Sequence, residues 1–146
     1  MSTGKRVDSE AIAESLHYAA IHLLRRLRQA DAASGLNSAR LSALSVIVFG
    51  GPITLGRLAD AEQVRPPTMT RIVNALEGKA LVTKNASASD RRTVHLSATR
   101  KGKRLLLEAR RRRIRSLARQ IAILSPHDRK TLHAAAAILN SLPRAL

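Results

Sequence analysis

Cysteine is absent from this sequence, and aromatic residues make up only 1% of it. Without cysteine there is no disulfide, no thiolate metal site and no thiol redox switch. With one Phe, one Tyr and no Trp, the core has to be built from Leu, Ile, Val and Ala. The 45% hydrophobic content is sufficient for such a core, and 146 residues correspond to a single domain.

Long hydrophobic runs are also missing. No segment approaches the roughly 18 apolar residues that a transmembrane helix requires. The N-terminal MSTGKRVDSE lacks the apolar stretch of a signal peptide. These absences predict a cytoplasmic protein that has no membrane partner.

Acidic residues are scarce, since 10 Asp and Glu face 26 Lys and Arg and leave a net charge of +16. Residues 32–125 hold eighteen basic and five acidic residues, a net +13, between two nearly neutral ends. Such a positive field attracts polyanions and speeds their encounter. Nucleic acid is the favoured partner and an anionic membrane the second, while a merely soluble surface is the plainest alternative.

Hydrophobic periodicity describes a mainly α-helical chain with one small β-hairpin. Two short strands, 81–84 and 92–96, flank the small polar residues of the hairpin tip. Possible N-caps are Ser38, Thr54, Thr99 and Ser125. The predicted helices span residues 9–33, 38–48, 55–62, 66–79, 100–124 and 126–142.

A short helix, a turn, a second helix and a hairpin follow one another at residues 55–96, which is the order of a helix-turn-helix with a wing. In VRPPTMTRIVNALE, residues 64–77, one face is apolar and the other polar. The second helix of such a motif enters the major groove, and its N-terminus offers free N–H groups to a phosphate. An ordinary solvated helix face, with prolines marking the helix start, is the alternative. The predicted DNA-binding residues of this helix are Arg65, Pro67, Thr68, Thr70, Arg71 and Asn74.

Over residues 36–142 the sequence resembles the MarR family of bacterial transcriptional regulators. The resemblance rests on ITLGRLAD at 53–60, VRPPTMTRIVNALE at 64–77, ALV at 80–82 and DRRTVHLSATRKG at 90–102. The last segment is the most specific. It combines an Asp-Arg-Arg wing, two β-type positions, and the threonine and glycine that open the long helix.

The resemblance implies a homodimeric winged-helix protein that binds double-stranded DNA at an inverted-repeat operator and associates with the bacterial nucleoid. Family members often act as repressors, and many release DNA when a small anionic or phenolic effector binds. For this chain it assigns residues 9–35 and 103–146 to a helical dimerisation region and 36–102 to the winged lobe, but no effector pocket. The amphipathic stripes of the terminal helices exceed what one small lobe can cover. The predicted dimer contacts are Ile12, Leu16, Leu117, Ile121, Leu132, Leu139 and Leu142.

The sequence departs from the family pattern at four positions. Arg65 stands where a small hydroxyl residue usually caps the recognition helix, so we expect it to reach phosphates instead. Arg57 replaces a common Glu, and Ala98 replaces a Leu at the base of the wing. Ala80 stands where a helix-ending glycine is usual. Because a left-handed position strains alanine, we expect the helix to end early, at Gly78.

The hairpin tip NASASDRR predicts a wing that contacts DNA through Ser89, Arg91 and Arg92. An arginine here would enter the minor groove, where the negative potential is strong. DNA would repel Asp90, so we expect Asp90 to hold the loop by pairing with one arginine while the other reaches DNA. Which arginine does which is open, and a merely solvated loop is the alternative. Arg57 and Lys84 are further candidates for phosphate contacts.

The run RRRR at 110–113 lies on the predicted long helix, with Arg110 on a seam formed by Leu107, Ile114 and Ile121. Two interpretations remain open. Most of these arginines would be solvated, or some would line a cleft where an anionic effector binds.

The five histidines show no metal-binding spacing. The chain also lacks a phosphate-cradling glycine loop, a nucleophile elbow and paired carboxylates. We therefore expect no enzyme activity, no catalytic residue, no metal and no cofactor. A ligand-blind architectural protein that coats DNA is the rival to a sequence-specific regulator. An RNA-binding module is disfavoured because it would need exposed aromatic residues.

Overall fold

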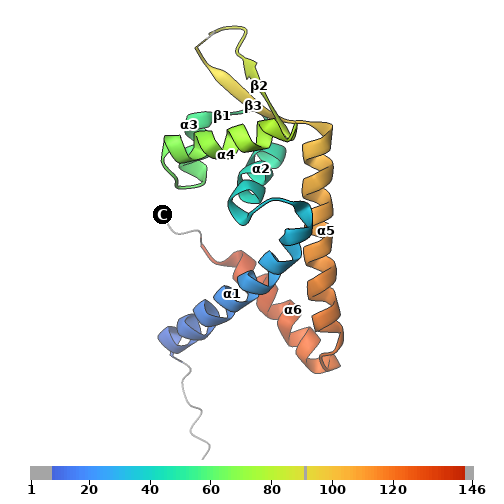
Figure 1. Ribbon diagram of the computed structural model, residues 1–146. Helices are drawn as coiled ribbons and strands as arrows, with labels where there is room; N and C mark the ends of the chain where they lie inside the picture. The colour runs from blue at the N-terminus through green and yellow to red at the C-terminus, as the bar shows by residue number, and fades with distance from the viewer. Residues whose placement is uncertain (1–7, 91, 144–146) are drawn as a thin grey trace, which may run out of the picture. The chain divides into compact units, whose positions relative to one another are not determined.

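The computed structural model describes residues 8–90 and 92–143 (Figure 1). Arg91, one of the predicted wing contacts, lies outside the described residues. The chain divides into two compact units, Met1–Arg113 and Ile114–Leu146. Each unit is described by itself.

The first unit contains a helix-turn-helix, a small sheet and most of the buried core. Its elements are α1 (Ser9–Asp31), the short 3₁₀ helix η1 (Ala32–Ser34), α2 (Ser38–Gly50), β1 (Ile53–Thr54), α3 (Leu55–Ala61), α4 (Pro66–Gly78), β2 (Val82–Ala86), β3 (Val94–Ala98) and the first part of α5 (Arg100–Ala122). The second unit contains the end of α5 and α6 (Pro126–Ser141). This mainly helical fold with a small antiparallel sheet confirms the predicted fold class.

Side-chain caps are present at three of the four predicted residues. The prediction was wrong at α2, where the cap is Asn37 and not Ser38. The Asn37 Oδ1 accepts a hydrogen bond from the Arg40 N–H at 2.9 Å, so Ser38 is already the first helical residue. The caps at Thr54, Thr99 and Ser125 are confirmed, with hydroxyl oxygens that accept from Arg57 N at 3.4 Å, Gly102 N at 3.0 Å and Asp128 N at 3.0 Å.

The sheet has three antiparallel strands in the order β1-β3-β2. The wing strands β2 and β3 pair with Lys84 opposite Leu96, and they lie one or two residues beyond the predicted strands. The short strand β1, which pairs Ile53 with Leu96, was not predicted. β1 leads directly into α3, so the sheet anchors the start of the helix-turn-helix as well as the wing.

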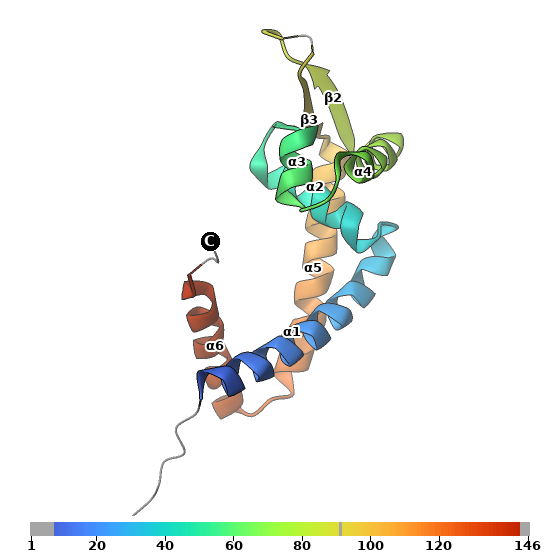
Figure 2. The same cartoon turned by 90° about the vertical axis from the view of Figure 1, so that its left-hand side faces the viewer.

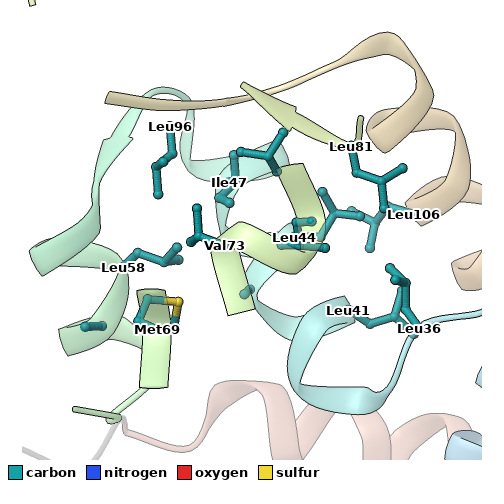
Figure 3. Close-up of a cluster of buried hydrophobic side chains, with 14 of the residues drawn as sticks. Leu36, Leu41, Leu44, Ile47, Leu58, Met69, Val73, Leu81, Leu96 and Leu106 are labelled. Carbon is teal, nitrogen blue, oxygen red and sulfur yellow. The ribbon is translucent and has the colours of Figure 1, made fainter. Parts of the chain in front are cut away.

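The core of the first unit is aliphatic, as the scarcity of aromatic residues predicts. α2 contributes Leu44 and Ile47, and α4 turns Met69, Val73 and Leu76 inward. Burial of three large side chains fixes the rotation of α4 about its axis, because turning it would expose them to water. Figure 3 shows side chains of α2 and α4 converging with those of the surrounding elements, among them Leu44, Ile47, Met69, Val73, Leu58, Leu81, Leu96 and Leu106.

The junction between α4 and α5 is held by backbone carbonyls. α4 ends at Gly78, as predicted, yet Ala80 still adopts a left-handed conformation with φ 57°. The Thr99 hydroxyl donates to the Ala80 carbonyl at 2.7 Å, and the Thr99 N–H donates to the Leu81 carbonyl at 3.0 Å. The early end of the helix therefore does not relieve the strain at Ala80, because the start of α5 fixes the carbonyls on either side of the turn.

Within the described part of the chain, no single helix is long and apolar enough to cross a membrane. The segments Ser9–Ser34 and Ser38–Gly50 meet the length and composition requirements only as a pair bent by 82°. One face of α2 is occupied by the core contacts of Leu44 and Ile47.

Candidate nucleic-acid interface

The turn between α3 and α4 directs the second helix across the first. Gln63 adopts a left-handed conformation with φ 53°. The Val64 N–H then donates to the carbonyl of Ala59 at 3.0 Å, which closes the turn. The tight turn expected at these residues is present, and it starts α4 at Pro66.

The polar face of α4 points away from the core. Because Met69, Val73 and Leu76 are buried, the polar residues between them, Thr70, Arg71 and Asn74, are turned outward and exposed. All six residues predicted to bind DNA from this helix are exposed: Arg65, Pro67, Thr68, Thr70, Arg71 and Asn74.

The start of α4 offers fewer free backbone N–H groups than we expected from the sequence. Pro66 and Pro67 occupy the first two helical positions and have no N–H. The next two N–H groups, of Thr68 and Met69, both donate to the carbonyl of Arg65, at 3.0 and 3.1 Å. The expectation that free backbone N–H groups at this helix end would bind a phosphate was therefore wrong. Side chains have to supply most of the donors to a phosphate here.

Two polar side chains of α4 already have partners within the protein. The Thr70 hydroxyl donates to the Pro66 carbonyl at 2.9 Å and keeps its acceptor sites. The Asn74 Oδ1 accepts from the Lys84 Nζ at 2.8 Å, and Lys84 also forms an ion pair with Glu77 at 2.7 Å. Asn74 therefore presents its NH₂ group outward. Bidentate reading of adenine, which needs the carbonyl oxygen as well, requires Lys84 to move.

Three exposed arginines lie near this face without a recorded acidic partner. Across residues 8–90 and 92–143, the ion pairs join Lys84 to Glu77, Arg112 to Glu108 and Arg113 to Asp31. Arg65, Arg71 and Arg57 take part in none of them. Their guanidinium groups are thus available to phosphates or base edges without first breaking an ion pair.

Asp90 organises the wing turn. We expected it to pair with an arginine side chain, and for Arg92 this expectation was wrong. Its carboxylate accepts from the Arg92 N–H at 2.9 Å and from the Thr93 hydroxyl at 3.0 Å. The Arg92 N–H, followed by the Thr93 hydroxyl, lowers the pKa of Asp90 from its ordinary value. Asp90 is close to both groups in sequence, so an Asx-type turn forms more readily than an ion pair with a flexible guanidinium.

Ser89 and Arg92, the predicted wing contacts that the structure describes, lie at an exposed tip. The Ser89 hydroxyl lies 2.9 Å from that of Ser87, and the Ser87 N–H donates to the Thr93 carbonyl at 2.8 Å. Since Asp90 binds the backbone of Arg92, the Arg92 guanidinium is left exposed for a partner outside the chain. The corresponding expectation for Arg91 concerns a residue outside the described part.

The apolar residues predicted at a dimer interface are exposed or half-buried within their own units. Ile12 and Leu16 of α1 are exposed, and they belong to an apolar set that continues through Ile21 and Leu24. In the second unit Leu117 and Ile121 are half-buried, whereas Leu132, Leu139 and Leu142 are exposed. Exposed apolar area on this scale is typical of a surface that another chain covers.

A pocket of about 450 Å³ lies within the first unit, among α1, α2 and α5. Its walls are largely apolar, and Arg28, Arg110 and Arg113 add positive charge. Whether any of the four consecutive arginines lines a cleft was open from the sequence. Arg110 and Arg113 line this pocket. The apolar lining includes Leu24, Leu27, Leu41, Phe49 and Leu106.

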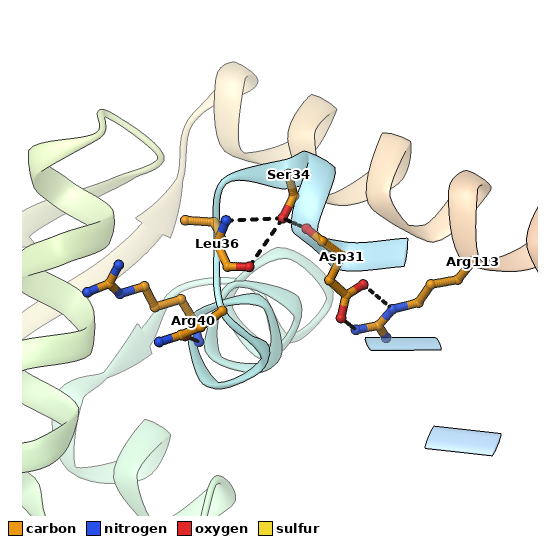
Figure 4. A network of polar contacts seen from close by, with 6 residues as sticks. Asp31, Ser34, Leu36, Arg40 and Arg113 are labelled. Atoms are coloured by element: carbon orange, nitrogen blue, oxygen red, sulfur yellow. Dashed lines mark hydrogen bonds and ion pairs between the residues drawn. The ribbon is translucent and has the colours of Figure 1, made fainter. Parts of the chain in front are cut away.

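Arg113 is anchored by a buried carboxylate that sequence reasoning did not single out. Its Nε and Nη2 atoms donate to the two oxygens of Asp31 at 2.6 and 2.5 Å, a bidentate pair shown in Figure 4. Asp31 is only 2% exposed. The hydrogen bonds that Arg113 donates to Asp31 raise the pKa of Arg113 above its ordinary value, so this guanidinium keeps its charge. The only sign in the sequence was an acidic residue, Asp31, near the end of the first predicted helix.

A helix-turn-helix whose second helix exposes arginine, hydroxyl and amide side chains, followed by a β-hairpin wing, defines a winged-helix DNA-binding protein. The model of the MarR family matches residues 36–94. The uncharacterized HTH-type transcriptional regulator Mb0904 of Mycobacterium bovis is 36% identical over 93% of this chain and 96% of its own length. Its counterpart ML2140 of Mycobacterium leprae is 34% identical over the same shares.

Solved structures share the fold at low sequence identity. RV1404 from Mycobacterium tuberculosis is 22% identical, with a TM-score of 0.80 over 99% of this chain and all of that one. The S. aureus MepR F27L mutant bound to an oligodeoxyribonucleotide is 16% identical, with a TM-score of 0.70 over 89% of this chain and 96% of that one. The chain belongs to the MarR family and is a DNA-binding transcriptional regulator, not an enzyme.

Proposed function

We propose that this regulator is a homodimeric repressor that inserts α4 of each subunit into the major groove of an inverted-repeat operator. The observation that carries the proposal is the exposed face of α4, where Arg71 stands without an acidic partner on a helix fixed by its buried side. A structural neighbour, MepR, binds an oligodeoxyribonucleotide, which supports this use of the fold.

The side chains divide by what each would contact. Arg71 suits the acceptor edge of guanine, and Thr68 and Asn74 lie beside it for neighbouring bases. Arg65 and Arg57 are assigned to phosphates, which position the protein without reading sequence. Thr70 and Pro67 shape the helix start. Lys84 would add a further phosphate contact, beside those of Arg65 and Arg57, if DNA drew it away from Glu77.

The wing would extend each half-site into the adjacent minor groove. Arg92 and Arg91 are the candidates for insertion, and Ser89 for a backbone contact. Asp90 acts within the protein by holding the turn that presents them. A narrow minor groove strengthens the attraction for an inserted guanidinium.

Dimerisation is assigned to residues 9–35 and 103–146, and DNA binding to residues 36–102. The exposed apolar side chains of α1 and α6, including Ile12, Leu132 and Leu139, support this division. Two-fold symmetry of the dimer would place the two recognition helices on one face of the DNA.

A small effector is assigned to the pocket among α1, α2 and α5. An aromatic body fits its apolar walls, and an anionic or phenolic group fits Arg110 and Arg28. Because α2 packs against α4 in the same core, a ligand that displaces α2 would disturb the recognition helix. Titration of aromatic carboxylates into the operator complex should release DNA from the wild-type protein. The Arg110→Gln variant should need a higher carboxylate concentration for the same release of DNA.

Replacement of Arg71 by alanine tests the recognition helix. We expect Arg71→Ala to weaken operator binding by about 1–3 kcal/mol and to relax the sequence preference at one base pair of each half-site. Arg65→Ser is the matched control, because losing a phosphate contact should weaken binding to all sequences alike. Binding isotherms for the operator and for single-base variants measure both effects. Unchanged affinity and preference in Arg71→Ala would contradict the assignment.

A further inference from the structure

Positive charge in this protein is concentrated away from the DNA-reading elements. Residues 36–98, which hold the helix-turn-helix and the wing, contain eight basic and four acidic residues. Residues 100–113 of α5 also contain eight basic residues but only one acidic residue, Glu108. A net +7 in one short helical segment thus exceeds the net +4 of the whole DNA-reading lobe.

Three of the four exposed arginines of this segment line up on one side of the helix. Gly102, Leu106 and Ala109 are buried, which fixes the side of α5 that faces the core. At 100° per residue, Arg100, Arg104 and Arg111 fall within about 40° of one another on the opposite side. Lys101 and Arg112 flank them. We call these five residues the α5 stripe.

The α5 stripe borders a hollow suited to an anion. A depression of about 200 Å³ is lined by Lys101, Arg104 and Arg112, with Ser34 at its edge. Glu108 also lines it but is engaged by Arg112 at 3.7 Å. Arg100, Arg104 and Arg111 have no ion pair among the described residues. Most of the stripe therefore has no internal partner to neutralise its charge.

Operator binding through α4 does not use most of this surface. Figure 1 and Figure 2 both show α5 starting beside the wing and running away from the hairpin and α4. From Arg100 to Arg111 the helix advances about 16 Å at 1.5 Å per residue. The far end of the stripe is thus displaced along α5 from the end where the recognition helix and wing lie.

We propose that the α5 stripe binds the phosphate backbone of a second DNA duplex, without regard to sequence, while α4 holds the operator. One strand presents a phosphate about every 3.4 Å of helix axis, so a stripe about 16 Å long spans about five phosphates. A dimer would carry two such stripes and link the operator to another DNA segment. This role goes beyond that of the proposed repressor.

The chemistry of the stripe favours DNA over other polyanions. Three of its members along the centre line are arginines, whose planar guanidinium forks match phosphate oxygens. A helix that binds a membrane needs an apolar face to insert into lipid. The opposite face of α5 is instead occupied by core contacts of Leu106 and Ala109. Single-stranded nucleic acid would call for stacking side chains, and none belongs to the stripe.

The test is capture of a second duplex by full-length protein on an operator. Bead-bound operator DNA is loaded with protein and exposed to a fluorescent duplex that lacks the operator. The test variant is Arg104→Gln with Arg111→Gln. The matched control, Arg25→Gln with Lys130→Gln, removes two exposed charges elsewhere. Thermal melting of each variant verifies folding, and binding to a short operator duplex is measured separately.

We expect the wild type and the control to capture the second duplex, and the stripe variant to capture it at least about tenfold less. Each lost phosphate contact should also lower the log–log salt slope of capture by about 0.9. Operator affinity of the stripe variant should stay within about twofold. Equal capture by the stripe variant, or no capture by the wild type, would overturn the proposal.

Two further results would also overturn the proposal. A parallel loss of operator affinity would make the stripe part of the operator contact. Retained duplex capture with lost binding to anionic phospholipid vesicles or to an acidic peptide would assign the stripe to that partner. A failure of the proposed repressor is distinguishable, because it would abolish operator preference and leave duplex capture intact.

Discussion

At Gly102 the backbone of α5 closely approaches Leu81, in the chain that leaves α4. A Cβ added there would overlap the Leu81 carbonyl oxygen and lie 3.0 Å from the carbonyl carbon. The same carbonyl accepts the Thr99 N–H, so it cannot move without opening the start of α5. The resemblance to the family pointed to this glycine, but only the structure shows that close backbone approach is the reason for it.

Gly102→Ala should therefore destabilise the protein by about 2 kcal/mol or more, since overpacking of a rigid site costs about 1–3 kcal/mol. Denaturant unfolding measures the change. Gly56→Ala is the matched control, because nothing lies within 4 Å of a Cβ at that helical position. A Gly102→Ala protein as stable as the control would refute the close approach.

Residues that make polar contacts with distant parts of the chain were the hardest to predict. The exposed face of α4, which includes Arg71 and Asn74, could be predicted because the apolar residues of this helix recur with the helical period. The bond from Lys84 to Asn74 joins residues ten apart, and that from Arg113 to Asp31 joins residues eighty-two apart. No local pattern reports such pairs, because tertiary folding alone brings them together.

At the scale of elements, helices were predicted more accurately than strands. The helix from Pro66 to Gly78 has proline at its start and a strong apolar period, and both signals are local. The wing strands were placed one or two residues early, because only five residues each carry the alternation. β1 was missed since two residues are too few to show a period.

The wing turn should depend on pH through Asp90. Its pKa lies below the ordinary value of 3.8 in the folded protein, because the charged form accepts hydrogen bonds from Arg92 and Thr93. The turn is thus fully stabilised above that value and loses this support as the pH falls through the lowered pKa. The protection factor of the Arg92 amide, measured by NMR and corrected for the intrinsic exchange rate at each pH, should stay constant down to about pH 4 and fall only below it.

Asp90→Asn is the control for the wing turn. It keeps one acceptor oxygen but has no charge, so its Arg92 amide should exchange faster at neutral pH and show no further acid transition. An acid transition of equal size in Asp90→Asn would assign the effect to another group.

At the scale of the whole molecule, we expect the exposed apolar surface to be covered by a second copy of the chain. Exposed apolar residues on α1, on α6 and at the end of α5 cannot all be covered by the units that carry them. We expect a stable dimer at micromolar concentration in sedimentation experiments. Leu132→Glu with Leu139→Glu should shift it toward monomer, because charges at an apolar interface are costly to bury. A wild-type monomer would contradict this expectation.

Charge at the scale of the whole molecule was only partly predictable. Counting along the chain located the positive field between residues 32 and 125. It did not reveal that Arg100, Arg104 and Arg111 share one exposed side of α5, or that Arg113 pairs with Asp31, because both depend on which helix face is buried. Attraction of polyanions follows from composition, whereas the surface that does the attracting follows from the fold.

Sequence-specific recognition by a symmetric dimer is the central claim, and selection from random duplex DNA tests it most directly. We predict an imperfect inverted repeat whose half-sites lie about 10–10.5 bp apart, centre to centre. The selected site should be bound at least about 10³-fold more tightly than random DNA at the same salt concentration. A ratio near one with no symmetric motif would contradict the account and identify an architectural protein that coats DNA through its charge.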